Sequence, residues 1–185
     1  GVSVVVALSE FLEVRIHKNG KIHYQRYERA KPVTGLEVLG DTNRTGTVIR
    51  FKPDDTIFET VEFSFDYLTT RLRELAFLNR GVRIMLKDER NDRLHDFKYD
   101  GGIVSFVEYL NQNKKPLGVK PILMEGSKEG MDVEVSLQYN EGYQENIFSF
   151  ANNINTIEGG THLSGFKSGL TRAVNTYIKN ADLLK

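Results

Sequence analysis

The chain has 185 residues, of which 39% are hydrophobic, enough for one larger domain or two small domains with an apolar core. Lys and Arg number 25, as do Asp and Glu, so no global field attracts the molecule to nucleic acid or to an anionic membrane, and any such contact must be local. The absence of cysteine excludes disulfides, thiolate zinc sites and cysteine nucleophiles, and it fits a cytoplasmic protein. No apolar run approaches about 18 residues, so we expect no membrane span.

The opening segment, GVSVVVALSEFL, is mostly apolar. It resembles the apolar region of a signal peptide, but no basic region precedes it and no small-residue cleavage site follows it, so we assign it to the fold. Residues 2–12 fit either a buried helix or a strand, because hydrophobic periodicity does not separate the two. A start on Gly rather than Met suggests that the chain begins partway through a longer protein.

Strand signals dominate the next part of the chain. Alternating residues predict strands at 12–17 and 21–28, and the Lys18-Asn19-Gly20 sequence between them is a strong hairpin signal. Further strands are expected at 36–40 and 45–53. Together these segments predict an antiparallel sheet.

A helix is expected over residues 63–79, whose apolar side chains recur at helical spacing. Gly81 lies near its C-cap position, and strands at 82–89 and 92–99 form a second hairpin. The Asp100-Gly101-Gly102 break precedes another helix at 103–113. We place a domain boundary at this break.

The rest of the chain predicts strands at 121–126, 130–139 and 145–153, the last two joined through Glu141-Gly142-Tyr143. A closing helix is expected from Thr161 to about Asn180. The fold class is therefore α+β, with two layers and mainly antiparallel sheets.

The closing helix offers a candidate binding surface. Thr161 is its predicted N-cap, and the glycines at 159 and 160 would let an anion or another backbone approach closely. Arg172 and Lys179 fall opposite its apolar stripe, with Lys167 at the edge. Two interpretations stand: a basic face for an anion, or a packed helix on which Lys167 extends over the core and the other two are merely solvated.

No complete catalytic centre is visible in the sequence. The four histidines, at 17, 23, 95 and 162, lack metal-ligand spacing, and no Ser-His-Asp order, Walker A motif or GxGxxG motif is present. We predict no metal site formed by this chain. The glycine in RTGTVIRF is most simply a turn or bulge near the entry of a strand.

Six segments nevertheless resemble the B subunits of the type IIA topoisomerases, DNA gyrase and topoisomerase IV. They occur in the family's order and spacing and cover essentially the whole chain: GVSVVVALSEFLEV, RTGTVIRFKPD, RLRELAFLNRGVRI, YDGGIVSFVEYLNQNKKP, GYQENIFSFANNI and EGGTHLSGFKSGLTRAVNTY. The resemblance implies that residues 1–99 are the C-terminal part of an ATPase domain with the fold shared by Hsp90, MutL and histidine kinases. Residues 100–185 would be the first part of a transducer domain resembling ribosomal protein S5.

The same resemblance implies cofactors, partners and site residues. The cofactors are ATP and Mg²⁺, and the partners are DNA, a gyrase A subunit in an A2B2 assembly, and a second B subunit that associates on ATP binding. Gly1 and Val2 would end the nucleotide lid, Thr47 would help to read adenine, partly through an ordered water, and Ile49, on the same strand face, would line its pocket. The DNA-binding residues would be Lys167 and Arg172.

The departures from the family limit what this chain can do. The family's catalytic glutamate, magnesium-binding asparagine and adenine-reading aspartate precede residue 1, and its γ-phosphate lysine follows residue 185, so we expect no ATP hydrolysis by this chain alone. Val6 replaces a usual Asn, and Lys18 replaces an Arg that contacts coumarins. Lys167 replaces a cavity-lining Arg and keeps the charge without bidentate phosphate geometry.

Three alternatives remain beside a gyrase-type subunit. A topoisomerase IV subunit fits equally well, and the residues alone would favour a non-catalytic S5-like module that binds nucleic acid. A MutL-like or Hsp90-like relative is disfavoured, because EGGTHLSGFK is a topoisomerase feature.

Overall fold

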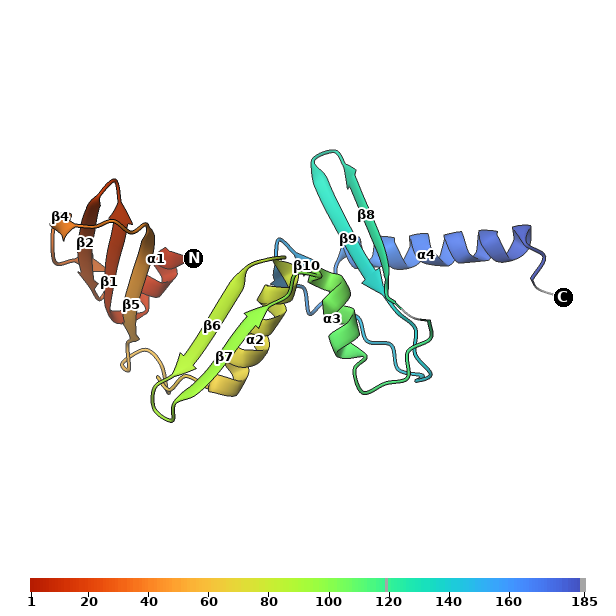
Figure 1. Cartoon of the computed structure of the whole chain (residues 1–185), viewed down its shortest axis with the longest axis horizontal. Helices are drawn as coiled ribbons and strands as arrows, with labels where there is room; N and C mark the ends of the chain where they lie inside the picture. Colours follow the sequence, from red (N-terminus) through yellow and green to blue (C-terminus); the bar gives the residue numbers. More distant parts are fainter. Residues whose placement is uncertain (119, 184–185) are drawn as a thin grey trace. The chain divides into compact units, whose positions relative to one another are not determined.

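The computed structural model describes residues 1–118 and 120–183. The chain divides into two compact units, Gly1–Ser64 and Phe65–Lys185, each described here by itself. Both contain helices and antiparallel strands (Figure 1), so the predicted α+β class is confirmed. In the described residues no helix has the length and apolar character needed to cross a membrane.

The first unit is a helix followed by a five-stranded antiparallel sheet. The strand order is β3-β2-β1-β5, and β4 also pairs with β2. The elements are α1 (Val2–Ala7), β1 (Ser9–Lys18), β2 (Lys21–Glu28), β3 (Lys31–Pro32), β4 (Glu37–Asp41) and β5 (Gly46–Pro53). The apolar opening segment therefore forms both a helix and a strand, with the change at Leu8, and the Ser9 hydroxyl donates a hydrogen bond of 2.6 Å to the Val5 carbonyl.

The first hairpin forms as predicted. Lys18 pairs with Lys21, and the two residues between them, Asn19 and Gly20, have φ angles of 53° and 74°. Two successive left-handed residues are what a two-residue hairpin turn requires, and Asn-Gly adopts them readily. This turn fixes the register of β1 against β2.

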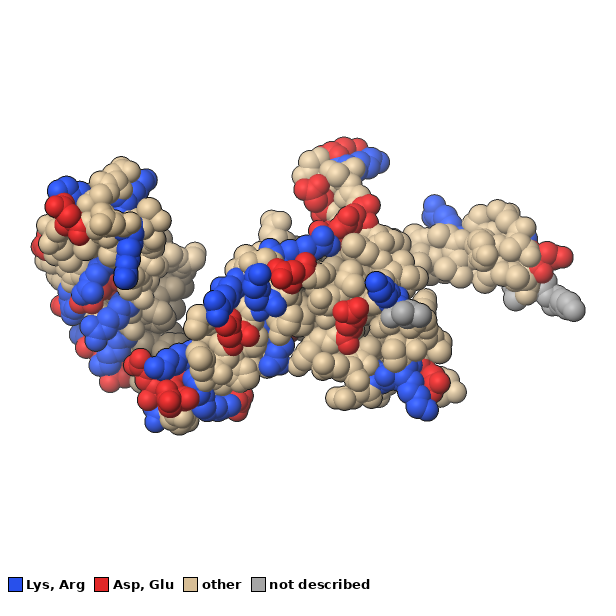
Figure 2. Space-filling model, in the orientation of Figure 1, with Lys and Arg blue, Asp and Glu red and all other residues tan. Residues whose placement is uncertain are grey.

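The second unit begins with a helix lying on a hairpin (Figure 1): α2 (Phe65–Leu78), β6 (Arg83–Asp88) and β7 (Arg93–Lys98). Its predicted elements are confirmed, and Gly81 has the left-handed φ of 78° expected after a helix. Basic and acidic side chains alternate over this hairpin (Figure 2), and several are paired: Arg83 with Asp96, Lys87 with Asp92, and Lys98 with Asp100.

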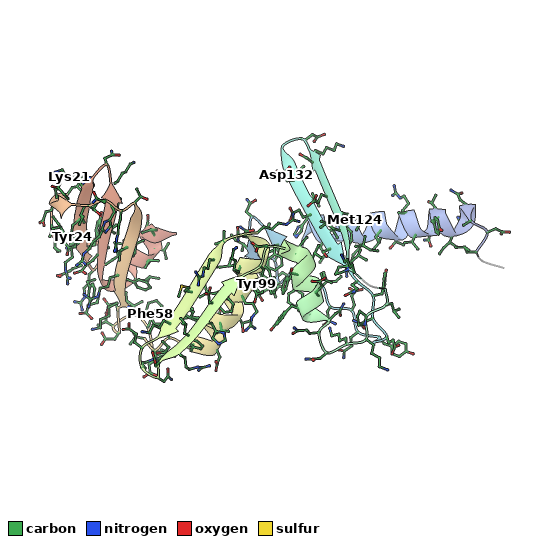
Figure 3. The ribbon with its side chains drawn as sticks, viewed as in Figure 1. Lys21, Tyr24, Phe58, Tyr99, Met124 and Asp132 are labelled. Carbon is green, nitrogen blue, oxygen red and sulfur yellow. The ribbon has the colours of Figure 1, made fainter. Side chains whose placement is uncertain are left out.

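Aromatic rings form the core of this unit. Phe77 is 1% exposed, and its ring stacks on Tyr99 at 3.6 Å and on Phe106 at 5.0 Å between centroids. Tyr99 follows β7 (Figure 3), and Phe106 lies on α3 (Gly102–Leu110). The rings therefore join α2, the hairpin and α3 into one packed body.

The glycines after β7 lie where two segments of the chain approach each other closely. Gly102 is buried with a φ of +59°, and a Cβ there would lie 2.5 Å from Nε of Arg80. The Arg80 guanidinium also pairs with Glu125, with 3.2 Å between Nη2 and Oε1. The domain boundary expected between residues 99 and 100 lies within this unit and remains a prediction.

The strands that follow are a hairpin and a short ribbon. β8 (Ile122–Lys128) pairs with β9 (Met131–Leu137), and β10 (Phe150–Ala151) pairs with β11 (Ile154–Asn155). The predicted strand at 145–153 is wrong over most of its length, because only Phe150–Ala151 forms a strand there. Asn152 and Asn153 have φ angles of 49° and 65°, so the chain turns back immediately after β10.

The closing helix, α4 (Thr161–Asn180), forms where it was predicted. Its N-cap is Gly160, which makes no side-chain hydrogen bond, so the assignment of the N-cap to Thr161 was wrong. Gly160 has extended backbone angles, and its carbonyl accepts a hydrogen bond from Ser164 N at 3.0 Å. None of the residues of α4 is buried, and the helix makes few contacts with other elements.

Candidate functional site

Two exposed surfaces carry the residues expected to bind ligands, one in each unit. In the first unit, Thr47 and Ile49 lie on β5, at the edge of the sheet. Thr47 pairs with Ile16 and Ile49 pairs with Val14, so the two residues share a face of the sheet. Both are exposed, Ile49 by 45%. The fold thus presents a hydroxyl and an apolar side chain together on one accessible strand face.

Gly1 and Val2 lie at the start of α1. The Gly1 carbonyl accepts a hydrogen bond from Val4 N at 3.0 Å, and the Val2 side chain is exposed. Among the described residues, no hydrogen bond joins Gly1 or Val2 to Thr47 or Ile49. The structure therefore brings together the two β5 residues, and it does not link them to the start of α1.

The opposite face of this sheet carries a cluster of charges around the buried Glu13, which the sequence did not reveal. Glu13 accepts a hydrogen bond of 2.6 Å from Nη1 of Arg26 on β2, and the Arg50 guanidinium of β5 lies 3.6 Å from its other oxygen. Burial opposes ionisation of Glu13, but the hydrogen bond and charge of Arg26 outweigh it and lower the pKa. Arg26 and Arg50 also lie over the ring of Phe11.

This cluster has a consequence for the exposed face. Glu13 on β1 is the cross-strand partner of both Arg26 and Arg50. A buried carboxylate held by two arginines links three adjacent strands and so supports the position of β5. Strict alternation along β5 then places Thr47 and Ile49 on the other side.

The second surface is the polar face of α4. A shallow groove runs along it, and the residues that line it are all of polar or charged types: Lys167, Ser168, Thr171, Arg172, Asn175, Thr176 and Lys179. The helix contains no Asp or Glu at all. Lys167 and Arg172, both predicted to bind DNA, are therefore on one face with a third cation, and the local charge is positive although the chain as a whole is neutral.

Lys167 belongs to this polar face and not to the apolar stripe. Its side chain is 49% exposed, and Nζ lies 2.6 Å from Oε1 of Glu145. The ammonium group of Lys167 thus faces a carboxylate, and its role in binding an anion remains a prediction. Within the described part of the chain, Arg172 and Lys179 form no ion pair. Sequence reasoning missed Glu145, which lies 22 residues from its partner.

The apolar stripe of the same helix is only partly covered. Leu163, Phe166 and Leu170 are half-buried, whereas Val174 and Tyr177 are exposed.

Across residues 1–118 and 120–183, no three His, Asp or Glu side chains gather as a metal site would require. Among the described residues, neither of the two surfaces pairs a nucleophile with a base.

Comparison with known proteins relates the chain to one family. The model of the DNA gyrase B family matches residues 102–185. The DNA gyrase B protein of Bacillus cereus is 57% identical over the whole chain, and that of Halalkalibacterium halodurans is 56% identical. The chain belongs to the DNA gyrase B family. It spans 46% of the first relative and 29% of the second.

A solved gyrase B structure has the same fold. The 43K ATPase domain of Thermus thermophilus gyrase B, in complex with an aminocoumarin, superposes with a TM-score of 0.86 at 38% sequence identity. The alignment covers 99% of this chain and 50% of that one. The family resemblance based on six sequence segments is thus confirmed, because the structural match extends over both units of the chain.

Proposed function

We propose that this chain is part of the ATP-operated clamp of a type II DNA topoisomerase, as a segment of a gyrase B subunit. In such a clamp, nucleotide binding and hydrolysis are coupled to the passage of one DNA duplex through another and so to supercoiling. The proposal is supported by the gyrase B relatives over the full chain and by the ATPase domain named in the structural comparison.

The observation that carries the proposal is the charge of α4. Its polar face presents Lys167, Arg172 and Lys179 without one carboxylate on the helix. Cations on an exposed helix attract phosphates whatever the base sequence, because phosphate contacts carry no sequence information. Such a face suits an enzyme that must let any duplex pass. The hairpin β6–β7, where acids accompany the bases (Figure 2), lacks this property.

The nucleotide side of the proposal rests on β5. Adenine has an apolar ring face and a polar edge, so Ile49 can cover the ring while the Thr47 hydroxyl hydrogen-bonds the edge, directly or through water. Gly1 and Val2 would complete the lid over the phosphates. ATP binds with Mg²⁺ in this family, and the resemblance places the metal ligand and the catalytic base outside these 185 residues, so this chain alone is not expected to hydrolyse ATP.

The partners follow from the same proposal. Two B subunits would close on ATP, and gyrase A subunits would complete an A2B2 enzyme in the cytoplasm. Nucleotide contacts made only in the closed dimer would shift an open–closed equilibrium toward closure. A topoisomerase IV B-type subunit is the second candidate, because its clamp would use the same surfaces.

The test uses Arg172→Gln, Lys179→Gln and the double variant in the complete enzyme. Removal of each phosphate-binding charge should lower the log–log salt slope of DNA binding by roughly 0.9, so the double variant should lose roughly twice that. DNA-stimulated ATPase and strand passage should fall, while basal ATPase stays unchanged. Lys114→Gln is the control, since it removes one exposed charge that does not belong to α4. If the double variant kept the parent's slope and DNA stimulation, the proposed DNA face would be wrong.

A further inference from the structure

One acidic side chain from outside α4 reaches its cationic face. Glu145 lies in the irregular segment between β9 and β10, and its Oε1 is 2.6 Å from Nζ of Lys167. Arg172 and Lys179 have no such partner among the described residues. One cation of the face is therefore neutralised within the chain while two are left for a ligand.

The segment that carries Glu145 is anchored where it begins. The amide of Asn111, a buried residue at the end of α3, donates to Gln138 Oε1 at 2.8 Å and accepts from Asn140 Nδ2 at 3.0 Å. Asn140 Oδ1 in turn accepts from the Gly142 backbone N–H at 2.8 Å. This chain of amides fixes the path of the backbone three residues before Glu145.

The segment is also anchored where it ends, and there it is tied to α4. Ser149 and Thr156 are joined by a backbone hydrogen bond of 2.8 Å and by their hydroxyls at 2.7 Å. The Thr156 hydroxyl lies 3.1 Å from Nε2 of His162, in the first turn of α4. Because hydrogen bonds hold both ends of this segment, the fold keeps Glu145 close to Lys167.

The pair is nevertheless open to exchange. The side chains of Lys167 and Glu145 are 49% and 69% exposed, and exposed ion pairs contribute little to stability. A phosphate oxygen accepts from an ammonium group as a carboxylate oxygen does. A duplex that reaches the face can therefore take Lys167 from Glu145 at small cost.

We propose that Glu145 acts as an internal competitor for the DNA backbone, neutralising Lys167 while the face is empty and yielding it when a phosphate arrives. This inference rests on the proposed DNA face of α4. Its consequence is weaker retention of DNA: the face holds a duplex with less affinity than its three cations would give. A clamp that must release the passed duplex benefits from such a restraint.

The experiment is a double-mutant cycle on the complete gyrase B protein, with a short random-sequence duplex titrated over a salt series. Glu145→Gln removes the competing charge, so DNA should bind about threefold more tightly at low salt, with a log–log slope steeper by up to roughly 0.9. In a Lys167→Gln background the same change should have almost no effect, because the cation that it releases is gone.

Glu141→Gln is the matched control. Glu141 lies in the same segment, but its carboxylate pairs with Lys115 at 3.3 Å, so the variant removes an equal charge without touching α4. Its affinity and slope should stay near those of the parent. Equal tightening by the two variants, or tightening by Glu145→Gln that persists without Lys167, would show a general loss of repulsion and overturn the proposal.

The two proposals can be separated in the same series. If Arg172→Gln and Lys179→Gln weaken DNA binding while Glu145→Gln changes nothing, the DNA face stands and the role of Glu145 is wrong. If Arg172→Gln and Lys179→Gln bind like the parent, both fail. Melting temperatures of all variants establish that each compared protein is folded.

Discussion

Helices α2 and α4 belong to the same unit but differ in what covers them. The shorter helix, α2, buries Phe65, Thr69, Ala76 and Phe77 against the β6–β7 hairpin and α3, whereas α4 buries none of its twenty residues. Stability is therefore concentrated around α2, and the proposed DNA contacts lie on α4. Substitutions in the two helices should therefore affect different measurements.

The largest effect is expected at the aromatic core. Phe77→Ala removes a ring that stacks on Tyr99 and Phe106, and truncation of a buried Phe lowers the free energy of unfolding by about 3–5 kcal/mol. Urea unfolding of the parent and the variant measures it. The matched control is Tyr177→Ala on α4, where the ring is 67% exposed and the change should stay within about 0.5 kcal/mol. Comparable losses at both sites would break the comparison.

Two glycine substitutions provide a second contrast, because they should change the stability of the protein in opposite directions. Gly102→Ala places a Cβ against the Arg80 side chain at a φ of +59°, so it should destabilise the protein by about 1–3 kcal/mol. Gly169→Ala in α4 meets no atom within 4 Å and improves helix propensity, so it should stabilise by about 0.5–1 kcal/mol. Thermal melts of both variants decide this, and a loss of stability with Gly169→Ala would reveal a covered face on α4.

Strand β5 in the first unit is exposed like α4, so we expect its proposed site residues to contribute to binding more than to stability. Thr47→Ala in the complete subunit should therefore weaken nucleotide binding several-fold, since a lost hydrogen bond is worth about 1 kcal/mol. Calorimetry measures the affinity, and the melting temperature should be retained because Thr47 is exposed. Thr45→Ala, at an exposed position just before β5, is the control. An unchanged nucleotide affinity would remove Thr47 from the site.

Much of this organisation could be predicted because it is local in sequence. The Asn19-Gly20 turn and the helical spacing of α2 are read from neighbouring residues, so both were predicted correctly. The strand expected at 145–153 forms only at Phe150–Ala151, and the two adjacent asparagines after it adopt left-handed angles and turn the chain.

Other features could not be predicted because they depend on distant partners. The Glu145–Lys167 pair spans 22 residues, and the Arg80–Glu125 pair spans 45. No periodicity in either segment reports such pairing, so the sequence left open whether Lys167 faced the core or a ligand. The expected roles of Thr47 and Ile49 came from family resemblance, and the fold adds that the two share an exposed face.

The most specific prediction concerns Asp88 at the end of β6. Its carboxylate accepts hydrogen bonds from the Arg90 side chain at 2.9 and 2.8 Å and from the Arg90 backbone N–H at 3.0 Å. These bonds to Arg90 lower the pKa of Asp88 from 3.8 to about 2. A carboxyl whose pKa is lower when folded stabilises the folded state above the unfolded pKa, and that contribution is lost as pH falls through the folded pKa.

The parent should therefore lose stability between pH 3.8 and about 2 by an amount that Asp88→Asn does not lose. Urea unfolding of both proteins over this range tests it, and the stability difference between them should be constant above pH 3.8 and shrink below it. Glu89→Gln is the control, because this neighbouring carboxylate is exposed and forms no ion pair among the described residues, so its removal should leave the acid profile of the parent in place. If Asp88→Asn loses stability in acid as the parent does, the acid sensitivity of this unit comes from other groups. The hydrogen bonds at the end of β6 then do not contribute to the stability of the packed region around α2.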